Sequence, residues 1–196
     1  MVHLPTGDEP PAGFEKLYKA RESVPPAGSL TIDSVSASQL ASFEKREISN
    51  MRARAARHYE ELTGKEAPEA TLEETLDFVP SDKTLTDKLV FRAYSGKYLA
   101  GYAEVICDWP GQGQWTIMTL IMDPSFRDIG IGRQLVVAIE ETAKSATISA
   151  SHVFAVPTQV VNPRFWSNFG FTEEAARLSW KIGDETYDLV LLKKAL

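Results

Sequence analysis

The residues best suited to chemistry lie in one short segment that is rich in glycine and arginine. Gly130 and Gly132 are two residues apart, and Arg127 and Arg133 flank them. Because glycine carries no side chain, backbone N–H groups at a helix start here can point outward without obstruction. Such N–H groups, with arginines beside them, attract anions. The segment therefore predicts a binding site for a phosphate or a diphosphate.

The spacing separates this loop from commoner phosphate-binding loops. A Walker loop requires Gly-x-x-x-x-Gly-Lys followed by Ser or Thr, and that pattern is absent. A dinucleotide-binding loop requires a third glycine where Leu135 stands. The alternative interpretation is a turn whose glycines only allow a helix to pack on a sheet.

The flanking residues predict a strand, a turn and a helix. Residues 115–122 carry apolar side chains on both alternating faces, so we expect a central strand buried on both sides. One face would hold Trp115, Ile117 and Ile121, and the other Met118, Leu120 and Met122. Pro124 ends the strand because it cannot donate to a sheet, and Asp123 is interpreted as a turn residue. The following helix has an apolar stripe that includes Ile131, Leu135 and Ile139.

The remaining residues predict strands and helices on either side of this unit. We expect a strand at 29–35 and a helix that begins at Ser36 or Ser38 and extends to about Leu62. Two hairpins, turning at 95–97 and 109–114, would place three antiparallel strands before the loop. The later elements are expected at residues 152–156, 163–169, 178–182 and 187–192. Residues 1–28 contain five prolines and predict an irregular N-terminal arm, whereas residues 29–196 predict a single domain.

Composition narrows the class of protein. A chain of 196 residues with 43% hydrophobic content can bury its own core, and a formal net charge of −6 argues against nucleic acid as a partner. No run of about 18 apolar residues predicts a membrane span, and no secretory leader is apparent. Cys107 is the only cysteine, so no intrachain disulfide and no metal site are expected. We expect Cys107 to be a buried packing residue and not a nucleophile. We also expect the protein to be cytoplasmic, where thiols stay reduced.

Two neighbouring stretches carry opposite charge. The first predicted helix is basic in its middle, which we interpret as a solvated face, with a phosphate site as the alternative; its basic residues are Lys45, Arg46, Arg52, Arg54 and Arg57. Residues 60–87 contain nine acidic residues against Lys65 and Lys83. This acidic stretch is either simply solvated or attracts a cationic amine.

The pattern Arg127-x-x-Gly130-x-Gly132 after Leu120, Ile121 and Met122 resembles the coenzyme A loop of the GNAT family of N-acetyltransferases. From about residue 29 to the end, the element order resembles the GNAT fold, an α/β (α+β) fold with a mixed central β-sheet flanked by helices. The resemblance implies acetyl-CoA as co-substrate. It implies that backbone groups of Leu120, Ile121 and Met122 bind the pantetheine arm, and that the diphosphate is wrapped by Asp128, Ile129, Gly130, Ile131, Gly132 and Arg133.

A second segment, Asn162 to Phe171, resembles the Asn-x-x-x-Phe-Tyr-x-x-x-Gly-Phe region of the same family, with altered spacing. The resemblance implies that Asn162 bonds the pantetheine amides, although a cap for the short helix is the alternative. Trp166 stands where many members have a tyrosine that protonates the departing thiolate. An indole donates a hydrogen bond but supplies no proton at neutral pH. Either Trp166 only shapes the thiolate pocket, or another group or water supplies the proton.

Acetyl transfer to an amine also needs a group that accepts the amine proton. Glu104 is the candidate base because it shares a half-polar face with Tyr102 and Asp108 on a neighbouring strand. The alternative for Glu104 is a salt bridge at the edge of the core.

The sequence gives only weak evidence for a catalytic base. This favours an acceptor amine that loses its proton easily. At pH 7, freeing a lysine-like amine of its proton costs about 4.6 kcal/mol, but an amine with a pKa near 8 costs about 1.4 kcal/mol. The acidic stretch, with Trp109 and Trp115, would suit a small, cationic, ring-bearing amine, and an aminoglycoside-type antibiotic is the leading example. A peptide or protein N-terminal α-amine is the second hypothesis, and a non-catalytic coenzyme A sensor is the third. GNAT proteins are often dimers, so the resemblance also allows a homodimer.

Overall fold

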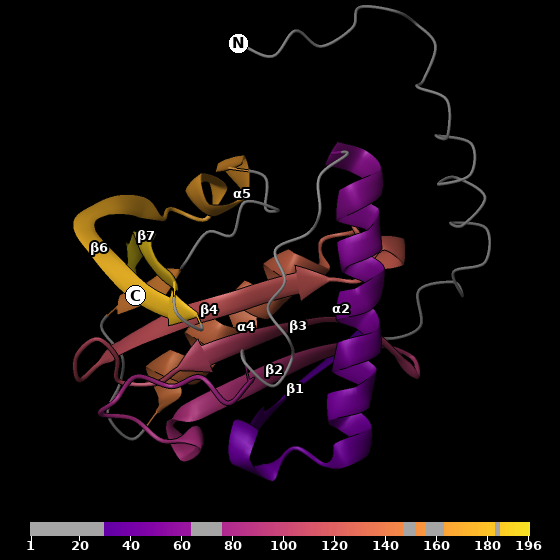
Figure 1. Ribbon diagram of the computed structural model, residues 1–196, viewed down its shortest axis with the longest axis horizontal. Helices are drawn as coiled ribbons and strands as arrows, with labels where there is room; N and C mark the ends of the chain where they lie inside the picture. The colour runs from indigo at the N-terminus through magenta and orange to yellow at the C-terminus, as the bar shows by residue number, and fades with distance from the viewer. Residues whose placement is uncertain (1–29, 64–75, 147–151, 156–162, 183–184) are drawn as a thin grey trace, which may run out of the picture.

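The structure is a computed structural model that describes residues 30–63, 76–146, 152–155, 163–182 and 185–196. Its centre is a seven-stranded sheet with the strand order β1-β2-β3-β4-β5-β7-β6 (Figure 1). The strands are β1 (Leu30–Ser36), β2 (Lys88–Ser95), β3 (Tyr98–Ile106), β4 (Gln114–Met122), β5 (His152–Ala155), β6 (Thr172–Ile182) and β7 (Glu185–Ala195). Only β4 and β5 run parallel, and every other neighbouring pair is antiparallel.

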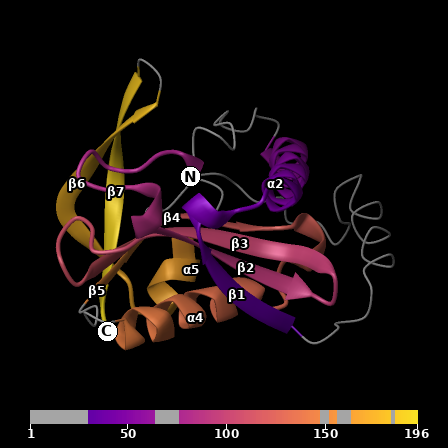
Figure 2. The ribbon, with the colours of Figure 1, turned by 90° about the horizontal axis from the view of Figure 1, so that it is seen from below.

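Helices cover both faces of this sheet. The long helix α2 (Ser42–Thr63) crosses one face, and α4 (Ile131–Ser145) lies on the opposite face, where α5 (Pro163–Asn168) also packs (Figure 2). Short 3-10 turns η1 (Ala37–Gln39), η2 (Leu85–Asp87) and η3 (Pro124–Phe126) connect the elements. The predicted mixed sheet flanked by helices is therefore confirmed.

Each face of the sheet has its own hydrophobic core. On the α4 side, Leu135 and Ile139 pack with sheet residues such as Phe91 and Val105, and all four are fully buried. On the α2 side, Ile48 and Met51 pack with Val90, Leu99 and Tyr102. The central strands are therefore buried on both faces, as the apolar residues of 115–122 predict.

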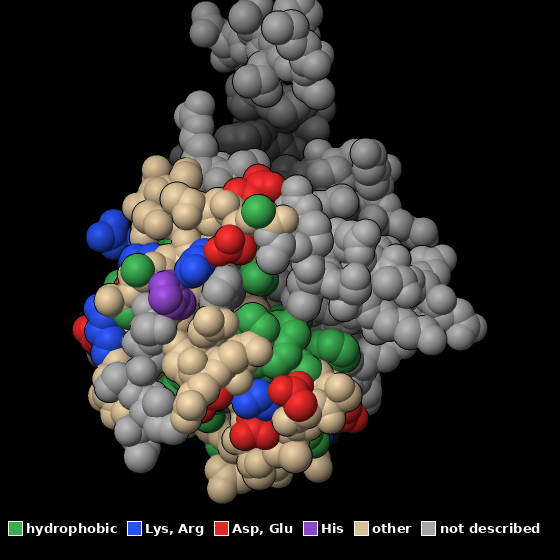
Figure 3. Space-filling view, turned by 90° about the vertical axis from the view of Figure 1, so that its left-hand side faces the viewer, with side chains coloured by type: hydrophobic (Ala, Val, Ile, Leu, Met, Phe, Trp, Pro, Cys, Tyr) green, Lys and Arg blue, Asp and Glu red, His purple; other side chains and the backbone are tan. Residues whose placement is uncertain are grey.

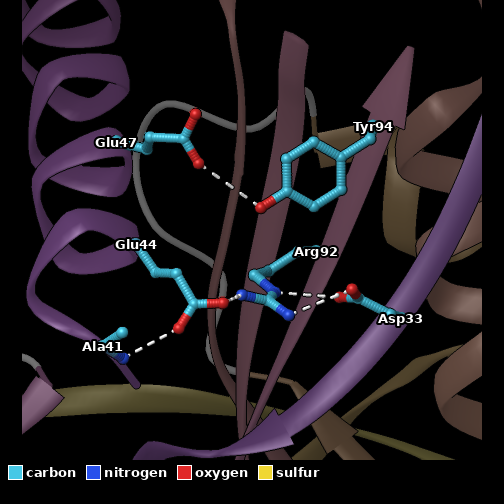
Figure 4. A network of polar contacts seen from close by, with 6 residues as sticks. All are labelled: Asp33, Ala41, Glu44, Glu47, Arg92 and Tyr94. Carbon is cyan, nitrogen blue, oxygen red and sulfur yellow. Dashed lines mark hydrogen bonds and ion pairs between the residues drawn. The ribbon is translucent and has the colours of Figure 1, made fainter. Parts of the chain in front are cut away.

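The N-terminal half of α2 is fastened to the sheet edge by a polar network (Figure 4). The guanidinium of Arg92 on β2 donates to both carboxylate oxygens of Asp33 on β1, at 2.8 and 3.0 Å, and its other terminal nitrogen donates to Glu44 on α2. Glu44 also accepts the N–H of Ala41 at 2.7 Å, which caps the start of the helix. One arginine thus ties together β1, β2 and α2.

The structure extends several predicted elements. β6 begins at Thr172 and β7 ends at Ala195, so this hairpin is longer than the predicted strands at 178–182 and 187–192. The start of β6 lacked a signal because Thr172, Glu173 and Ala175 are exposed and polar or small, as an edge strand permits. The predicted arm at 1–28 and residues 64–75 of the acidic stretch lie outside the described residues.

The surface at the β6–β7 end of the molecule carries both signs of charge. In Figure 3, acidic and basic side chains lie above and below a group of hydrophobic ones. In the part of the chain that the structure describes, no helix is long and apolar enough to cross a membrane.

Candidate functional site

The carboxyl end of β4 is the centre of the candidate site, and a β-bulge shapes it. Val105 pairs with Ile117 and Glu104 pairs with Thr119, so Met118 is an extra residue in β4. The bulge shifts the alternation of side chains beyond it. Ile121 consequently packs with the core under α2, whereas Trp115 and Ile117 pack with the core under α4. The prediction that these three share a face is wrong for this reason.

The described pairing of β4 with β5 reaches the residue before the bulge. It is parallel and runs from Gln114–His152 to Ile117–Ala155. Beyond Met118, residues 119–122 of β4 pair with β3 on one side. An extended ligand that pairs with the other edge at Leu120, Ile121 and Met122 would bind as an added strand does.

The turn that follows β4 is built around Asp123. Its carboxylate oxygen Oδ1 accepts the N–H of Ser125 at 2.9 Å, and its carbonyl accepts the N–H of Phe126 at 2.9 Å. These bonds close the turn η3, with Pro124 at its first position. Asp123 is thus the turn residue that the sequence predicted.

The loop then enters α4 through two residues with left-handed backbone geometry. Asp128 has φ 62° and Gly130, the N-cap of α4, has φ 86°. Aspartate and glycine are among the residues that accept this region most readily. Gly130 offers no side chain to the N–H groups of the first helical turn, and a Cβ there would meet nothing within 4 Å. Those N–H groups are consequently accessible to an anion.

The arginines of the loop have different environments. Arg127 is half-buried and has no hydrogen-bond partner among the described residues. Burial lowers its pKa, and the negative charges of Asp128 and Asp123 oppose that effect. Arg133 is exposed, with its guanidinium carbon 5.5 Å from the ring centre of Phe169. A half-buried cation without a hydrogen bond is suited to a bound anion.

The second glycine of the loop lies against α5. A Cβ on Gly132 would lie 3.4 Å from the ring of Phe165 on α5 and 3.8 Å from the sulfur of Met122, which are ordinary van der Waals distances. The first turn of α4, α5 and the end of β4 therefore meet at this position. The anion site at Gly130 stays a prediction, and Gly132 is the glycine that lies against α5.

Trp166, on α5, is almost completely buried, with 2% of its surface exposed. Its ring packs edge to face against Phe165 and Phe171, with centroid distances of 5.0 and 5.1 Å. The indole N–H is buried without a hydrogen-bond partner among the described residues. Asn162, the other family-derived candidate on this segment, lies outside the described residues.

Glu104 lies on β3, opposite Thr119 of β4, and is fully buried. Its Oε2 is 2.6 Å from Nζ of Lys88, which is equally buried and also donates to the carbonyls of Leu76 and Phe78. Nη1 of Arg52, on α2, lies 4.0 Å from Oε1 of Glu104. The salt bridge that the sequence analysis gave as the alternative role of Glu104 is therefore present. Lys88 is the nearest partner of Glu104.

Tyr102 belongs to the same polar group and pairs with Ile121 across the strands. Its hydroxyl accepts a hydrogen bond from Nη1 of Arg52 at 2.8 Å. Burial, followed by the negative charge of Glu104, raises the pKa of Tyr102 far above its usual value, which Arg52 only partly offsets. The four residues Arg52, Tyr102, Glu104 and Lys88 thus form a buried charged group between α2 and the end of β4.

Reasoning from the sequence did not identify several residues of this region. The basic stretch of α2 is only partly the predicted solvated face, because Arg52 faces Tyr102 and Arg54 binds Asp123, whereas Arg46 and Arg57 are exposed. A signal was available for Arg52, which is four residues after the buried Ile48 and next to the buried Met51. Nothing in the sequence marks Lys88 as buried.

Two further predictions concern metals and the cysteine. No group of histidine, cysteine, aspartate and glutamate residues that could hold a metal ion is found within the described ranges. Cys107 is half-buried in the core region under α4, and burial, with the charges of Asp108 and Asp87, raises its pKa to about 12. The thiol is therefore not activated as a nucleophile.

The seven-stranded mixed sheet, with one parallel pair, flanking helices and a glycine loop between β4 and α4, is the GNAT fold. The chain belongs to the Acetyltransferase (GNAT) family, whose sequence model matches residues 51–171. Membership implies acetyltransferase activity with acetyl-CoA as the acetyl donor. No protein among those with curated descriptions matches the sequence.

Solved structures share the fold at low sequence identity. An acetyltransferase from Thermus thermophilus is 22% identical, with 87% of this chain and 99% of that chain covered and a TM-score of 0.54. The ribosomal-protein-S18-alanine N-acetyltransferase of Escherichia coli is 14% identical, with 85% and 93% covered and a TM-score of 0.57. A GCN5-related N-acetyltransferase from Rhodopseudomonas palustris is 15% identical, with 88% and 98% covered and a TM-score of 0.57.

Proposed function

We propose that this protein transfers the acetyl group of acetyl-CoA to the primary amine of a small cationic acceptor, with an aminoglycoside-type antibiotic as the leading example. The observation that supports this most strongly is that the end of β4 leads, through the turn at Asp123, into the open N-terminus of α4 at Gly130. An extended arm with a diphosphate at one end matches both features.

In this proposal the donor lies along β4. Backbone groups of Leu120, Ile121 and Met122 pair with the pantetheine amides, and a backbone N–H at this strand end stabilises the developing oxyanion. The diphosphate is bound by the seven loop residues Arg127, Asp128, Ile129, Gly130, Ile131, Gly132 and Arg133. The neutral amine attacks the thioester carbon, the C–N bond forms, the C–S bond breaks, and the thiolate leaves.

We propose that Glu104 is the base that accepts the proton lost by the acceptor amine. Glu104 faces the α2 side of the sheet, as Tyr102 and Ile121 do, so its carboxylate lies on the side from which an acceptor could reach the end of β4. Lys88 compensates the charge of the carboxylate in the buried state. Glu104 is therefore both a member of an ion pair and the candidate base.

A double substitution separates these two roles of Glu104. Glu104→Gln alone should lower the free energy of unfolding by about 3 kcal/mol, because the buried Lys88 loses the carboxylate nearest to it. Lys88→Met with Glu104→Gln should recover most of that stability, yet kcat should remain about 100-fold or more below that of the unaltered enzyme. Recovery of kcat together with stability would show that Glu104 is only structural. Urea unfolding and steady-state kinetics measure the two quantities.

The α5 segment completes the proposed donor site. Trp166 borders the thiolate pocket and has a free indole N–H that could donate a hydrogen bond there, but it supplies no proton. Water or another group then protonates the thiolate. Asn162 is proposed to bond the pantetheine amides.

The choice of acceptor rests on charge. The acidic residues of 60–87 would attract a polycation, and an acceptor amine with a pKa near 8 needs little help from a base. Of the two tryptophans considered for a ring-bearing acceptor, Trp115 is only 4% exposed and packs in the core under α4, so it is not available for stacking. Trp109 is half-buried and remains a candidate.

A peptide or protein N-terminal α-amine is the second candidate acceptor. It is favoured by the similarity to the Escherichia coli enzyme that acetylates the alanine of ribosomal protein S18, and an α-amine also lies near pKa 8. Competition for acetyl transfer between an aminoglycoside and a library of peptides separates the two classes. Tight binding of coenzyme A with no thiol release from any amine in either panel would favour the third reading, a non-catalytic sensor.

A further inference from the structure

An ion pair joins the middle of α2 to the first residue after β4. Nε and Nη2 of Arg54 both lie 2.7 Å from Oδ2 of Asp123. The two residues are far apart in the sequence, and Figure 1 shows that β4 ends beside α2. The side chain of Asp123 is only 5% exposed, whereas that of Arg54 is 45% exposed. Arg54 thus approaches a buried carboxylate from the surface.

Asp123 transmits this contact to the loop. Its backbone N–H donates to the carbonyl of Ala100 on β3 at 3.0 Å, which fixes the exit of β4. Its other carboxylate oxygen holds the N–H of Ser125, and its carbonyl holds the N–H of Phe126. The direction of the chain toward Asp128 and Gly130 therefore depends on where Asp123 is held.

The ion pair also affects the charge beside the proposed diphosphate site. Asp123 interacts electrostatically with Arg127, the half-buried arginine of the loop. Without Arg54, the carboxylate of Asp123 would retain its negative charge with one fewer cation beside it. That charge would attract Arg127 and repel a diphosphate.

We propose that Arg54 is a positioning residue for the coenzyme A diphosphate. It acts from α2 through Asp123, the first residue after β4. This inference rests on the proposed function. Arg54 holds Asp123 so that the loop keeps its path into α4, and it offsets the buried negative charge so that Arg127 stays available to the ligand.

Calorimetric titration with coenzyme A tests the proposal. Arg54→Ala should raise the dissociation constant about tenfold, within the usual range for coupling between two sites. Arg54→Lys keeps the charge but loses the two-nitrogen contact, so its dissociation constant should lie between those of Arg54→Ala and the unaltered protein. Arg57→Ala is the matched control, because it removes the same charge from an exposed position on the same helix and should leave the dissociation constant unchanged.

A second variant separates positioning from mere destabilisation. In Arg54→Ala with Asp123→Asn, the side-chain oxygen that accepts the N–H of Ser125 is kept and the unbalanced charge is removed. Affinity for coenzyme A should recover toward that of the unaltered protein. In steady-state kinetics, Arg54→Ala should raise KM for acetyl-CoA and leave kcat within about twofold, as expected for a loss of uniform binding.

The outcomes distinguish this inference from the proposed function. If the unaltered protein binds coenzyme A and Arg54→Ala binds it equally well, the role of Arg54 is refuted and the proposed function stands. Equal losses of affinity in Arg54→Ala and Arg57→Ala would show a general effect of charge and would likewise refute it. Absence of coenzyme A binding by the unaltered protein would refute the proposed function itself.

Discussion

At the scale of single residues, Gly130 shows how a missing side chain leaves the start of a helix open. Its positive φ permits the sharp entry into α4, and a Cβ there would meet nothing within 4 Å. The sequence identified Gly130 as a candidate through its spacing to Arg127 and Gly132. It could not show that the two glycines have different surroundings, because only the structure places Phe165 beside Gly132 and open space beside Gly130.

Substitution of Gly130 tests the anion site. Gly130→Asp should raise the dissociation constant for coenzyme A roughly 100-fold, because a unit charge about 5 Å from a phosphate costs about 3 kcal/mol at an effective dielectric constant near 20. Gly130→Asn has the same shape and accepts a positive φ, so its dissociation constant should change far less. Similar dissociation constants for the two variants in calorimetry would contradict an anion at this position.

Cys107 provides a prediction about reactivity. Burial raises its thiol pKa to about 12, so almost no thiolate exists at pH 8. Iodoacetamide should label the unfolded protein in urea within minutes and leave the folded protein unlabelled over the same period. Mass spectrometry measures the labelled fraction, and rapid labelling of the folded protein would show that Cys107 is more exposed than the structure indicates.

The polar residues beneath α2 show which contacts could not be predicted from the sequence. Glu104 was identified together with its alternative as an ion-paired residue, but its nearest partner, Lys88, was not. Arg54 was counted with the solvated residues because a run of basic residues on a helix is usually a solvated face. In the structure, 45% of its side chain is exposed even though its guanidinium binds Asp123. A contact between residues 54 and 123 depends on the packing of α2 on the sheet, and local spacing carries no information about it.

At the scale of elements, β4 shows both what patterning predicts and what it omits. The apolar run predicted a strand buried on both faces, and the structure confirms it. The bulge at Met118 was not predicted, because no glycine or proline marks it and both flanking residues suit a strand. Its consequence is large, since it shifts Ile121 to the α2 side of the sheet.

The attachment of α2 to the sheet has a testable dependence on pH. Burial raises the pKa of Glu44, but the N–H of Ala41 and the guanidinium of Arg92 lower it by more, so the folded pKa lies below the ordinary value of 4.5. Glu44 therefore contributes stability above pH 4.5 that is lost as the pH falls through the folded pKa. Glu44→Gln should lower the free energy of unfolding at pH 7 by about 1 to 3 kcal/mol and weaken its dependence on pH below 4.5.

Glu47→Gln is the matched control for this prediction. Glu47 lies one helical turn after Glu44 and receives only a 3.5 Å contact from the hydroxyl of Tyr94 (Figure 4). Its substitution should change the free energy of unfolding by a few tenths of a kcal/mol. Equal effects of the two substitutions in urea unfolding at pH 7 would show that the Arg92 network does not anchor α2.

At the scale of the whole molecule, the sequence predicted the order of the elements and the fold class, and family membership agrees with both. The hairpins and the single parallel pair follow from connection lengths, since neighbouring strands joined by short turns are antiparallel. The identity of the acceptor amine does not follow from the fold or from family membership. Structures with identities of 14 to 22% share the fold, and a shared fold does not determine the amine that is acetylated.

The most direct test of the central claim is a crystal structure of the protein with acetyl-CoA bound. The account predicts electron density for the diphosphate against the backbone N–H groups at the start of α4, beside Gly130 and Arg127, with the pantetheine arm along residues 120–122 of β4. Density that places the diphosphate away from the start of α4, or the arm away from residues 120–122 of β4, would contradict it.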